Sequence, residues 1–267
     1  GPGSMPQSAV MNVMVQAAMK AGRSLVRDYG EVQNLQVSLK GPADYVSQAD
    51  RKAEKIIFNE LSKARPKFGF LMEESEEIIG EDSQHRFIVD PLDGTTNFLH
   101  GIPFFAVSIA LESQGKIVAG VIYNPINDEL FTAERGSGAF FNDRRCRVSA
   151  RRRLEDCVIA TGMPHLGRPG HGTYLIELRN VMAEVSGIRR FGTAALDLAY
   201  VAAGRTDGFW EDNLQIWDMA AGILMVREAG GFVTDKEGGN DIFRKKNIIA
   251  GNEHIRIKLE RALKKGI

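Results

Sequence analysis

The sequence predicts an α/β protein in which helices and strands alternate along the chain, and three observations carry this prediction. Residues 8–29 place apolar side chains at helical spacing. Short apolar runs at residues 68–72 and 87–89 have the length of buried strands, and carboxylates follow each of them directly. Residues 104–134 form apolar and polar runs with turn residues between them, which favours antiparallel strands.

Length and composition indicate one globular unit. The chain has 267 residues, which is enough for one large domain or for two closely packed halves. Residues 1–4 (Gly-Pro-Gly-Ser) look like an expression remnant, so we leave them out of the fold. We expect residues 5–267 to form a single domain with two halves, at about 5–153 and about 154–267.

Charge and cysteine content argue against several functional classes. Lys+Arg and Asp+Glu both number 34, so no overall basic field favours nucleic acid. Cys146 and Cys157 have no metal-site spacing and are too few for a disulfide scaffold, which favours reduced thiols. No signal peptide is visible, and the apolar neighbourhood at 104–111 is too short to span a bilayer. We therefore expect a soluble, cytoplasmic protein without a membrane partner.

Helical spacing and helix-breaking residues define the expected elements of the N-terminal region. Ser8 has the side chain of an N-cap, and Gly30 is expected to stop the first helix. Pro66 limits the second helix, because the residue before a proline avoids the helical conformation. The expected order is a helix at 8–29, an extended segment at 32–39, a loop at 40–43, a helix that starts between Asp44 and Asp50 and reaches about Ala64, and a strand at 68–72.

The second part of the chain continues the alternation of strands and helices. Gly136-Ser137-Gly138 lacks the third glycine of a dinucleotide fingerprint and therefore predicts a turn. For the arginines at 144–153 a solvated face is the simpler interpretation, and an anionic partner is the alternative. The expected strands are 104–112, 116–123, 130–134, 139–141, 157–161, 188–191, 207–211, 232–234 and 247–250. Four helices are expected as well: one at 173–185, one that begins after residue 191 and reaches 203, one at 218–229 and one at 254–265.

Residues 88–97 carry the strongest chemical signal of the chain. Asp90 and Asp93 follow an apolar run, and Pro91 between them predicts a sharp turn because proline cannot continue strand pairing. Two close carboxylates need a proton or a cation between them, and oxygen-only ligands favour magnesium, calcium or manganese. The amides of residues 94–96 would face an anion. The stretch therefore predicts a site for a cation and a phosphate, with a capped acidic turn as the alternative.

Acidic residues elsewhere in the chain can join this stretch. Glu73 ends the 68–72 strand, so Glu73 and Asp90 would meet if the two apolar strands are neighbours. A solvated acidic turn is the alternative for Glu73. For Asp50 and Asp218, taken alone, capping of a helix start is the simpler interpretation.

Three motifs together resemble the signature of the inositol monophosphatase family. They are Glu73-Glu74-Ser75, Asp90-Pro91-Leu92-Asp93-Gly94-Thr95-Thr96-Asn97 and Trp217-Asp218, in this order. Residues 189–200 look like the bacterial SuhB-like branch of that family in particular. The resemblance extends from the first helix to the last strand.

This resemblance implies a fold, an activity and partners. The implied fold is the layered α-β-α-β-α sandwich of the inositol monophosphatase and sugar phosphatase type. The implied activity is hydrolysis of small phosphate monoesters, most notably myo-inositol 1-phosphate, by a water that two or three magnesium ions activate. Such enzymes are commonly lithium-sensitive homodimers. Of the two expected halves, the first would bind the metal and the second would complete the substrate site.

The resemblance also implies roles for individual residues, with one departure. Where some family members contact the substrate through a serine after residue 160, this chain has Thr161-Gly162-Met163-Pro164. The implied roles are Glu73, Asp90 and the Leu92 carbonyl for a first metal; Asp90, Asp93 and Asp218 for a second; Glu73 with waters for a third; Thr95 with Asp50, beside Glu73, for orienting the attacking water; Asp93 and the Gly94 and Thr95 amides for the phosphate end of the substrate; and Glu211 with Gly192, Thr193 and Ala194 for its alcohol part.

Three alternatives remain open at this stage. Haloacid-dehalogenase-type enzymes also use acidic Gly-Thr loops, but with Asp-x-Asp spacing, whereas Asp90 and Asp93 are separated by two residues. Within the family, fructose 1,6-bisphosphate, a 3′-phosphoadenosine nucleotide or histidinol phosphate are other substrates. SuhB-like proteins also act in transcription antitermination, so transcription factors or RNA are alternative partners. Arg189 and Arg190 are candidates for that surface, or equally for a dimer contact or for support on the substrate side.

Overall fold

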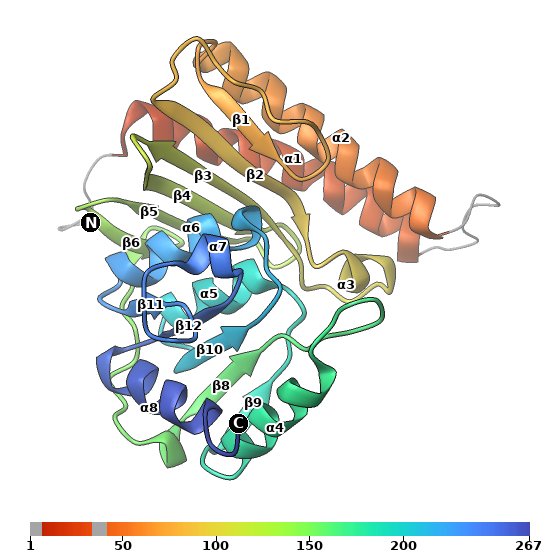
Figure 1. The fold of residues 1–267 in the computed structure, drawn as a ribbon. Coiled ribbons are helices and arrows are strands. Elements are labelled where there is room, and N and C mark those ends of the chain that lie inside the picture. Colours follow the sequence, from red (N-terminus) through yellow and green to blue (C-terminus); the bar gives the residue numbers. More distant parts are fainter. Residues whose placement is uncertain (1–6, 34–41) are drawn as a thin grey trace.

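The chain, described by a computed structural model over residues 7–33 and 42–267, forms five stacked layers (Figure 1). Two helices cover one face of a seven-stranded sheet, and two further helices fill the space between that sheet and a five-stranded sheet. A third pair of helices covers the outer face of the smaller sheet. The predicted α-β-α-β-α sandwich is confirmed.

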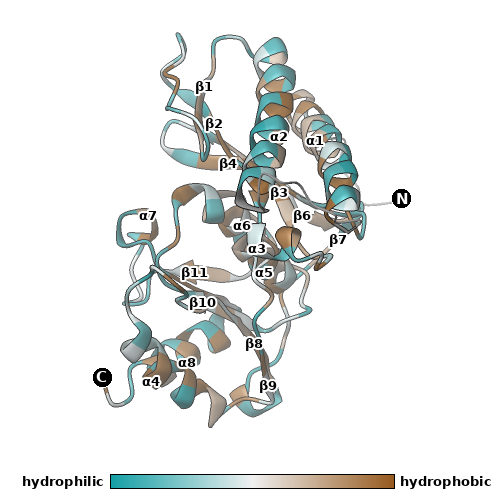
Figure 2. Cartoon of the chain, turned by 90° about the vertical axis from the view of Figure 1, so that its right-hand side faces the viewer, coloured by the Kyte–Doolittle hydropathy of each residue, from teal (hydrophilic) through white to brown (hydrophobic). Residues whose placement is uncertain are grey.

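The outer helices are α1 (Ala9–Gln33) and α2 (Pro42–Ala64), which pack on the large sheet. Figure 2 shows hydrophilic and hydrophobic residues on both, as expected for helices with one face on a sheet. The Ser8 hydroxyl accepts a hydrogen bond from the Met11 amide at 3.1 Å, as predicted for the start of α1.

Two expectations in this region are wrong. Helix α1 continues through Gly30, because burial of Tyr29 and Val32 outweighs the cost of about 1 kcal/mol for a glycine in a helix. The expected extended segment therefore begins with helical residues, and residues 34–39 lie outside the described part. Helix α2 starts at Pro42, inside the expected loop, because proline fits the first position of a helix.

The large sheet is an antiparallel meander with one parallel strand at its edge. Strand β1 pairs parallel to β2, and all other neighbours are antiparallel, as the alternating runs predicted. The strands are β1 (Gly69–Met72), β2 (His85–Asp93), β3 (Ala106–Ser113), β4 (Lys116–Asn124), β5 (Glu129–Glu134), β6 (Gly138–Phe141) and the unpredicted β7 (Arg144–Arg145).

The expected turn at Pro91 is a bulge within β2 instead. Ladder pairing with β3 stops after Asp90 and resumes at Asp93. The missing N–H of Pro91 therefore falls where no ladder bond is needed. This bulge leaves both aspartates at the same end of the strand.

The middle layer consists of α5 (Ala194–Ala202) and α6 (Ile216–Glu228), which pack against both sheets. Small residues permit close approach: a side chain at Gly120 of β4 would lie 3.1 Å from Ala221 of α6. Most apolar residues of this layer are almost completely buried, and Tyr200, Ile216 and Trp217 are partly buried. The layer thus fixes α6, whose first turn carries Asp218, against the sheet that carries Asp90.

The second half contains the five-stranded sheet and its outer helices. Strand order is β11-β12-β10-β8-β9, and the short helix α7 was not predicted because four residues give no periodic signal. No helix of the described residues is both long and apolar enough to cross a membrane. The elements are β8 (Val158–Thr161), α4 (His171–Met182), β9 (Gly187–Arg189), β10 (Gly208–Glu211), β11 (Phe232–Thr234), α7 (Ile242–Lys245), β12 (Ile248–Gly251), α8 (Glu253–Leu263), and the short helices α3 (Thr95–Leu99) and η1 (Leu154–Asp156).

Candidate functional site

The parallel pairing of β1 and β2 places Glu73 beside Asp90. Met72 pairs with Val89, and the Glu73 amide donates to the Val89 carbonyl at 3.3 Å. Both side chains line one cavity, and the charge of Glu73 is among the causes that raise the pKa of Asp90. The prediction that these two strands are neighbours, and that their acids meet, is therefore confirmed.

Asp93 is held by the second half of the chain. Its Oδ2 accepts hydrogen bonds from the Thr193 hydroxyl at 2.6 Å and from the Ala195 amide at 2.8 Å. Thr193 is also the N-cap of α5, since its hydroxyl accepts from the Leu196 amide. One threonine therefore fixes both the start of α5 and the orientation of Asp93.

Asp218 completes a group that we call the Asp90 cluster (Asp90, Asp93 and Asp218). One oxygen from each of the three lies within 4.8 Å of the others. Asp218 Oδ2 also accepts from the Gln215 amide at 2.8 Å, so its helix-capping interpretation holds too. Capping orients this carboxylate without excluding a second role, because a carboxylate has four acceptor positions.

A second group, the Asp50 cluster (Asp50, Glu73 and Glu74), lies next to the first. Its carboxylate oxygens also lie within 4.8 Å of one another. Glu54, one helical turn after Asp50, accepts from the Glu74 amide at 2.9 Å and from the Ser75 hydroxyl. Sequence analysis missed the part that Glu54 and Glu74 play here, although acids four residues apart on α2 share a helix face.

Burial and repulsion from neighbouring carboxylates raise the pKa of five of these acids, namely Asp50, Glu73, Asp90, Asp93 and Asp218. Burial is the largest cause of the raised pKa of Asp90, followed by the charges of Asp93 and Glu73. Burial likewise raises the pKa of Asp93 to about 7 and that of Asp50 to about 10. Asp50 Oδ1 and Glu73 Oε2 are buried and have no hydrogen-bond partner among the residues that the structure describes. An all-oxygen donor set with excess negative charge fits a hard divalent cation such as Mg²⁺.

We predict that stabilisation by Mg²⁺ grows with pH. The folded-state pKa of Asp93 lies near 7, above its ordinary 3.8, so the metal-free protein loses stability as pH rises between these values. Mg²⁺ replaces the bound proton, so the rise in Tm on adding it should be larger at pH 8 than at pH 5.5. Calorimetry of chelator-treated protein with and without Mg²⁺ tests this, and an equal rise at both pH values would contradict it.

The Asp90 cluster opens into a cavity of about 160 Å³ that residues from both halves line. Gly94 has φ 98°, and a Cβ there would lie 3.2 Å from Phe105, so glycine is required for this turn. Asp50 does not line the cavity, although Thr95 does. The expected site residues that line it are Glu73, Asp90, Leu92, Asp93, Gly94, Thr95, Gly192, Ala194, Glu211 and Asp218.

Glu211 is the last residue of β10, and its carboxylate lies beside Gly162, which directly follows β8. A Cβ at Gly162 would lie 1.9 Å from Glu211 Oε1, so the absence of a side chain makes room for this carboxylate. Burial first, and then Asp93 and Asp218, raise its pKa to about 8. Arg168 approaches it to 3.9 Å. The cavity therefore has an acidic floor and a mixed-charge wall.

Basic side chains line that wall, and sequence analysis missed most of them. His165, Arg168 and Arg190 border the cavity, whereas Arg189 is exposed on β9 and donates to the Ile188 carbonyl. The loop at 162–170 carried no motif that would have indicated this position. The cavity thus offers cations to the substrate as well as carboxylates to a metal.

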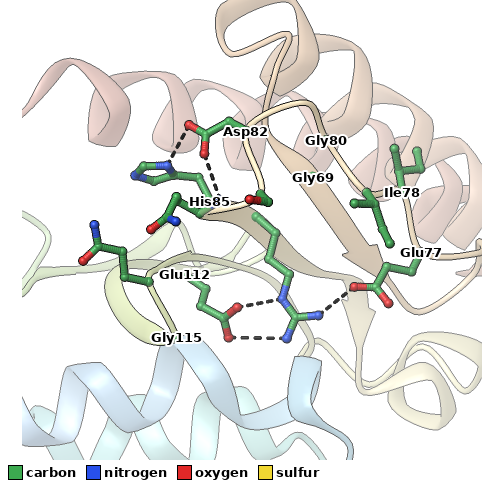
Figure 3. Close-up of a pocket in the computed structure, with 13 residues that line it drawn as sticks. Gly69, Glu77, Ile78, Gly80, Asp82, His85, Glu112 and Gly115 are labelled. Atoms are coloured by element: carbon green, nitrogen blue, oxygen red, sulfur yellow. Dashed lines mark hydrogen bonds and ion pairs between the residues drawn. The ribbon is translucent and has the colours of Figure 1, made fainter.

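Two backbone hydrogen bonds and the ion pairs of one arginine hold the segment that contains Glu73 and Glu74. We call these contacts the latch, and its ion pairs are drawn in Figure 3. After the two acids the chain turns back, and Phe70 and Ile78 exchange two backbone hydrogen bonds of 2.8 Å each. The Arg86 guanidinium lies between Glu77 at 2.9 Å and Glu112 at 2.8 Å. Arg86 therefore ties the returning segment to strands β2 and β3.

We predict that Arg86→Met weakens metal binding while it spares the fold. Exposed ion pairs contribute up to about 1 kcal/mol each, so the Mg²⁺ concentration for half-maximal activity should rise about 2–5-fold. Hydrogen exchange of the Phe70 and Ile78 amides should quicken in metal-free protein. Arg144→Met, at an exposed position of β7, is the matched control. Unchanged exchange together with unchanged Mg²⁺ dependence would show that the latch is unimportant.

Comparison with known proteins gives consistent matches over nearly the whole chain. The model of the inositol monophosphatase family matches residues 7–266. An inositol-1-monophosphatase of Mesorhizobium japonicum is 73% identical over 98% of both chains, and Nus factor SuhB of Escherichia coli K12 is 44% identical over 92% of both. The crystal structure of extragenic suppressor protein SuhB from Bartonella henselae is 99% identical, with a TM-score of 0.92 over 97% of this chain and 100% of that one.

Proposed function

Because this chain belongs to the inositol monophosphatase family and is a phosphatase, we propose that its main substrate is myo-inositol 1-phosphate and that it requires Mg²⁺. The observation that supports this most is the convergence of Glu73, Asp90, Asp93 and Asp218 beside the Gly94 turn. These acids come from three separate segments and meet at a cavity, which a capped acidic turn does not explain.

The proposed metal ligands are those that the family resemblance implies, and the geometry supports them. Glu73, Asp90 and the Leu92 carbonyl would hold one ion, and Asp90, Asp93 and Asp218 would hold another. A third ion at Glu73 with waters is supported by the adjoining Asp50 cluster. Bound Mg²⁺ would supply charge neutralisation and a lowered pKa for water.

The remaining residues bind the substrate and orient the attacking water. Gly94 and Thr95 amides hold the phosphate, and Thr95 with Asp50 and Glu73 positions the water. Glu211 and the turn at 192–194 contact the alcohol part. Water attacks phosphorus directly, the P–O bond to the alcohol breaks, and the alcohol oxygen takes up a proton. Phosphate found covalently on Asp90 after acid quenching would contradict this mechanism.

A substrate panel at fixed Mg²⁺ tests the substrate assignment. We expect the highest kcat/KM with myo-inositol 1-phosphate among that compound, fructose 1,6-bisphosphate, a 3′-phosphoadenosine nucleotide and histidinol phosphate. Loss of activity on chelation and recovery with Mg²⁺ form the second arm. A preference for the nucleotide or the bisphosphate would overturn the substrate assignment, and activity without any divalent ion would overturn the metal assignment.

A second role in transcription is supported by the relative named Nus factor SuhB. We propose that the exposed β9 surface with Arg189 contacts a transcription factor or RNA, and that the protein is a homodimer. Arg190 is a poor probe because it lines the cavity. Arg189→Ala should lose co-purification with transcription proteins while retaining phosphatase activity. Equal recovery by wild type and variant would remove Arg189 from that surface.

A further inference from the structure

A separate cavity of about 420 Å³ lies at the C-terminal end of α6. Its walls come from that helix, from α7, and from the turns that follow β3 and β5. Asp218, in the first turn of α6, is nine residues away from Arg227 in the last turn, which is about 14 Å along the axis. This cavity is therefore distinct from the one over the Asp90 cluster.

Three cations border this cavity: Lys116, Arg135 and Arg227. Within residues 7–33 and 42–267, none of them forms an ion pair with a carboxylate. Arg227 makes one hydrogen bond, to the Val233 carbonyl at 3.2 Å. Burial, and then the charge of Arg135, lowers the pKa of Arg227. Both guanidiniums therefore line the same cavity, where the positive charge of Arg135 acts on Arg227.

The acid that borders the cavity is already engaged elsewhere. Glu228 Oε1 accepts from the amides of Gly136 at 3.0 Å and Gly138 at 2.9 Å, in the turn that carries Arg135. Glu228 therefore positions that turn, and it forms no ion pair with either guanidinium in the described part of the chain. A different cavity, which Gly115 also borders, contains Arg86. The arginine of that cavity differs from Arg135 and Arg227 because it is paired with two carboxylates (Figure 3).

The floor of the cavity is apolar. Ile223, Leu224 and Ile242 are almost completely buried beneath it, while Ile117 and Phe243 remain partly exposed. A ligand here would meet hydrocarbon on one side and positive charge on the other. Arginine suits such a ligand because its planar fork binds carboxylate and phosphate groups through two parallel hydrogen bonds.

We propose that this cavity binds a small organic anion that carries a carboxylate or phosphate on an apolar body. The anionic group lies between Arg135 and Arg227, with Lys116 beside it, and the apolar body covers Ile117 and Phe243. The anion relieves the repulsion between the two guanidiniums. Its site does not include any proposed metal ligand or substrate contact.

The test uses the full chain with Mg²⁺ and 4-(trifluoromethyl)benzoate, observed by ¹⁹F NMR. Wild type should bind this probe saturably, and Arg135→Gln/Arg227→Gln should lose affinity by at least about tenfold, since two charge-assisted hydrogen bonds disappear. The control Arg144→Gln/Arg179→Gln makes the same charge change at exposed positions and should bind like wild type. Both double variants should retain phosphatase activity and Tm.

Two further arms identify the recognised group. The neutral 4-(trifluoromethyl)benzamide should not bind, and displacement of the probe by phenylacetate or by phenylphosphonate shows which anionic group is preferred. Absence of saturable binding by wild type would overturn the proposal. Equal affinity of the two double variants, or equal affinity for benzoate and benzamide, would also overturn it.

Discussion

Asp93→Asn is expected to lower kcat by about 10²–10³-fold or more at saturating Mg²⁺, because electrostatic stabilisation carries most of the catalysis in such a site. Asparagine is nearly isosteric with aspartate, and its amide oxygen can accept the hydrogen bonds that Thr193 and Ala195 donate to Asp93. The change therefore removes a ligand charge without removing packing. Near-normal turnover at saturating Mg²⁺ would contradict the proposed role.

The same variant should behave in the opposite way when metal is absent. Burial, and then the charge of Asp218, raise the pKa of Asp93 to about 7, so its negative charge opposes folding above that pH. At pH 8, chelator-treated Asp93→Asn should melt at a higher temperature than chelator-treated wild type, and the order should reverse with Mg²⁺. Asp143→Asn, at an exposed turn, controls for the loss of one negative charge. A lower Tm in both conditions would indicate a damaged fold.

The acids of the site could be predicted because each follows a recognisable local pattern. Glu73 and Asp90 end short apolar runs, and parallel neighbours bring such ends together. The motif with Trp217-Asp218 added the third segment through resemblance. In contrast, the bulge at Pro91 depends on the register between β2 and β3, which no local pattern contains.

Other parts of the site depend on tertiary contacts alone. Arg168 and His165 belong to a loop whose sequence has no hydrophobic periodicity. Only the folded position of this loop shows that both residues line the cavity. Glu54 looks like an ordinary exposed acid of an amphipathic helix, yet it is 4% exposed and holds the turn after Glu73. At Gly30 the local pattern predicted the end of helix α1, but burial of the neighbouring residues outweighs this effect and the helix continues.

Gly162→Ala is expected to raise KM for the substrate about tenfold with little change in Tm. The added Cβ would lie 1.9 Å from Glu211 Oε1 and 2.0 Å from Cδ, so the Glu211 carboxylate must move. Moving the end of a flexible side chain costs little stability, but the alcohol part of the substrate then loses a hydrogen bond to Glu211, which contributes up to about 1.5 kcal/mol. Gly172→Ala, where a side chain meets open space, is the matched control.

A double-mutant cycle separates this mechanism from a general disturbance of the loop after β8. If Gly162→Ala acts by displacing Glu211, then Gly162→Ala/Glu211→Ala should have the same KM as Glu211→Ala alone, because the contact can be lost only once. If the alanine instead perturbs Met163 and the rest of the 162–170 loop, the two effects will multiply. Multiplying effects would show that Gly162 matters for the backbone of that loop and not for the position of Glu211.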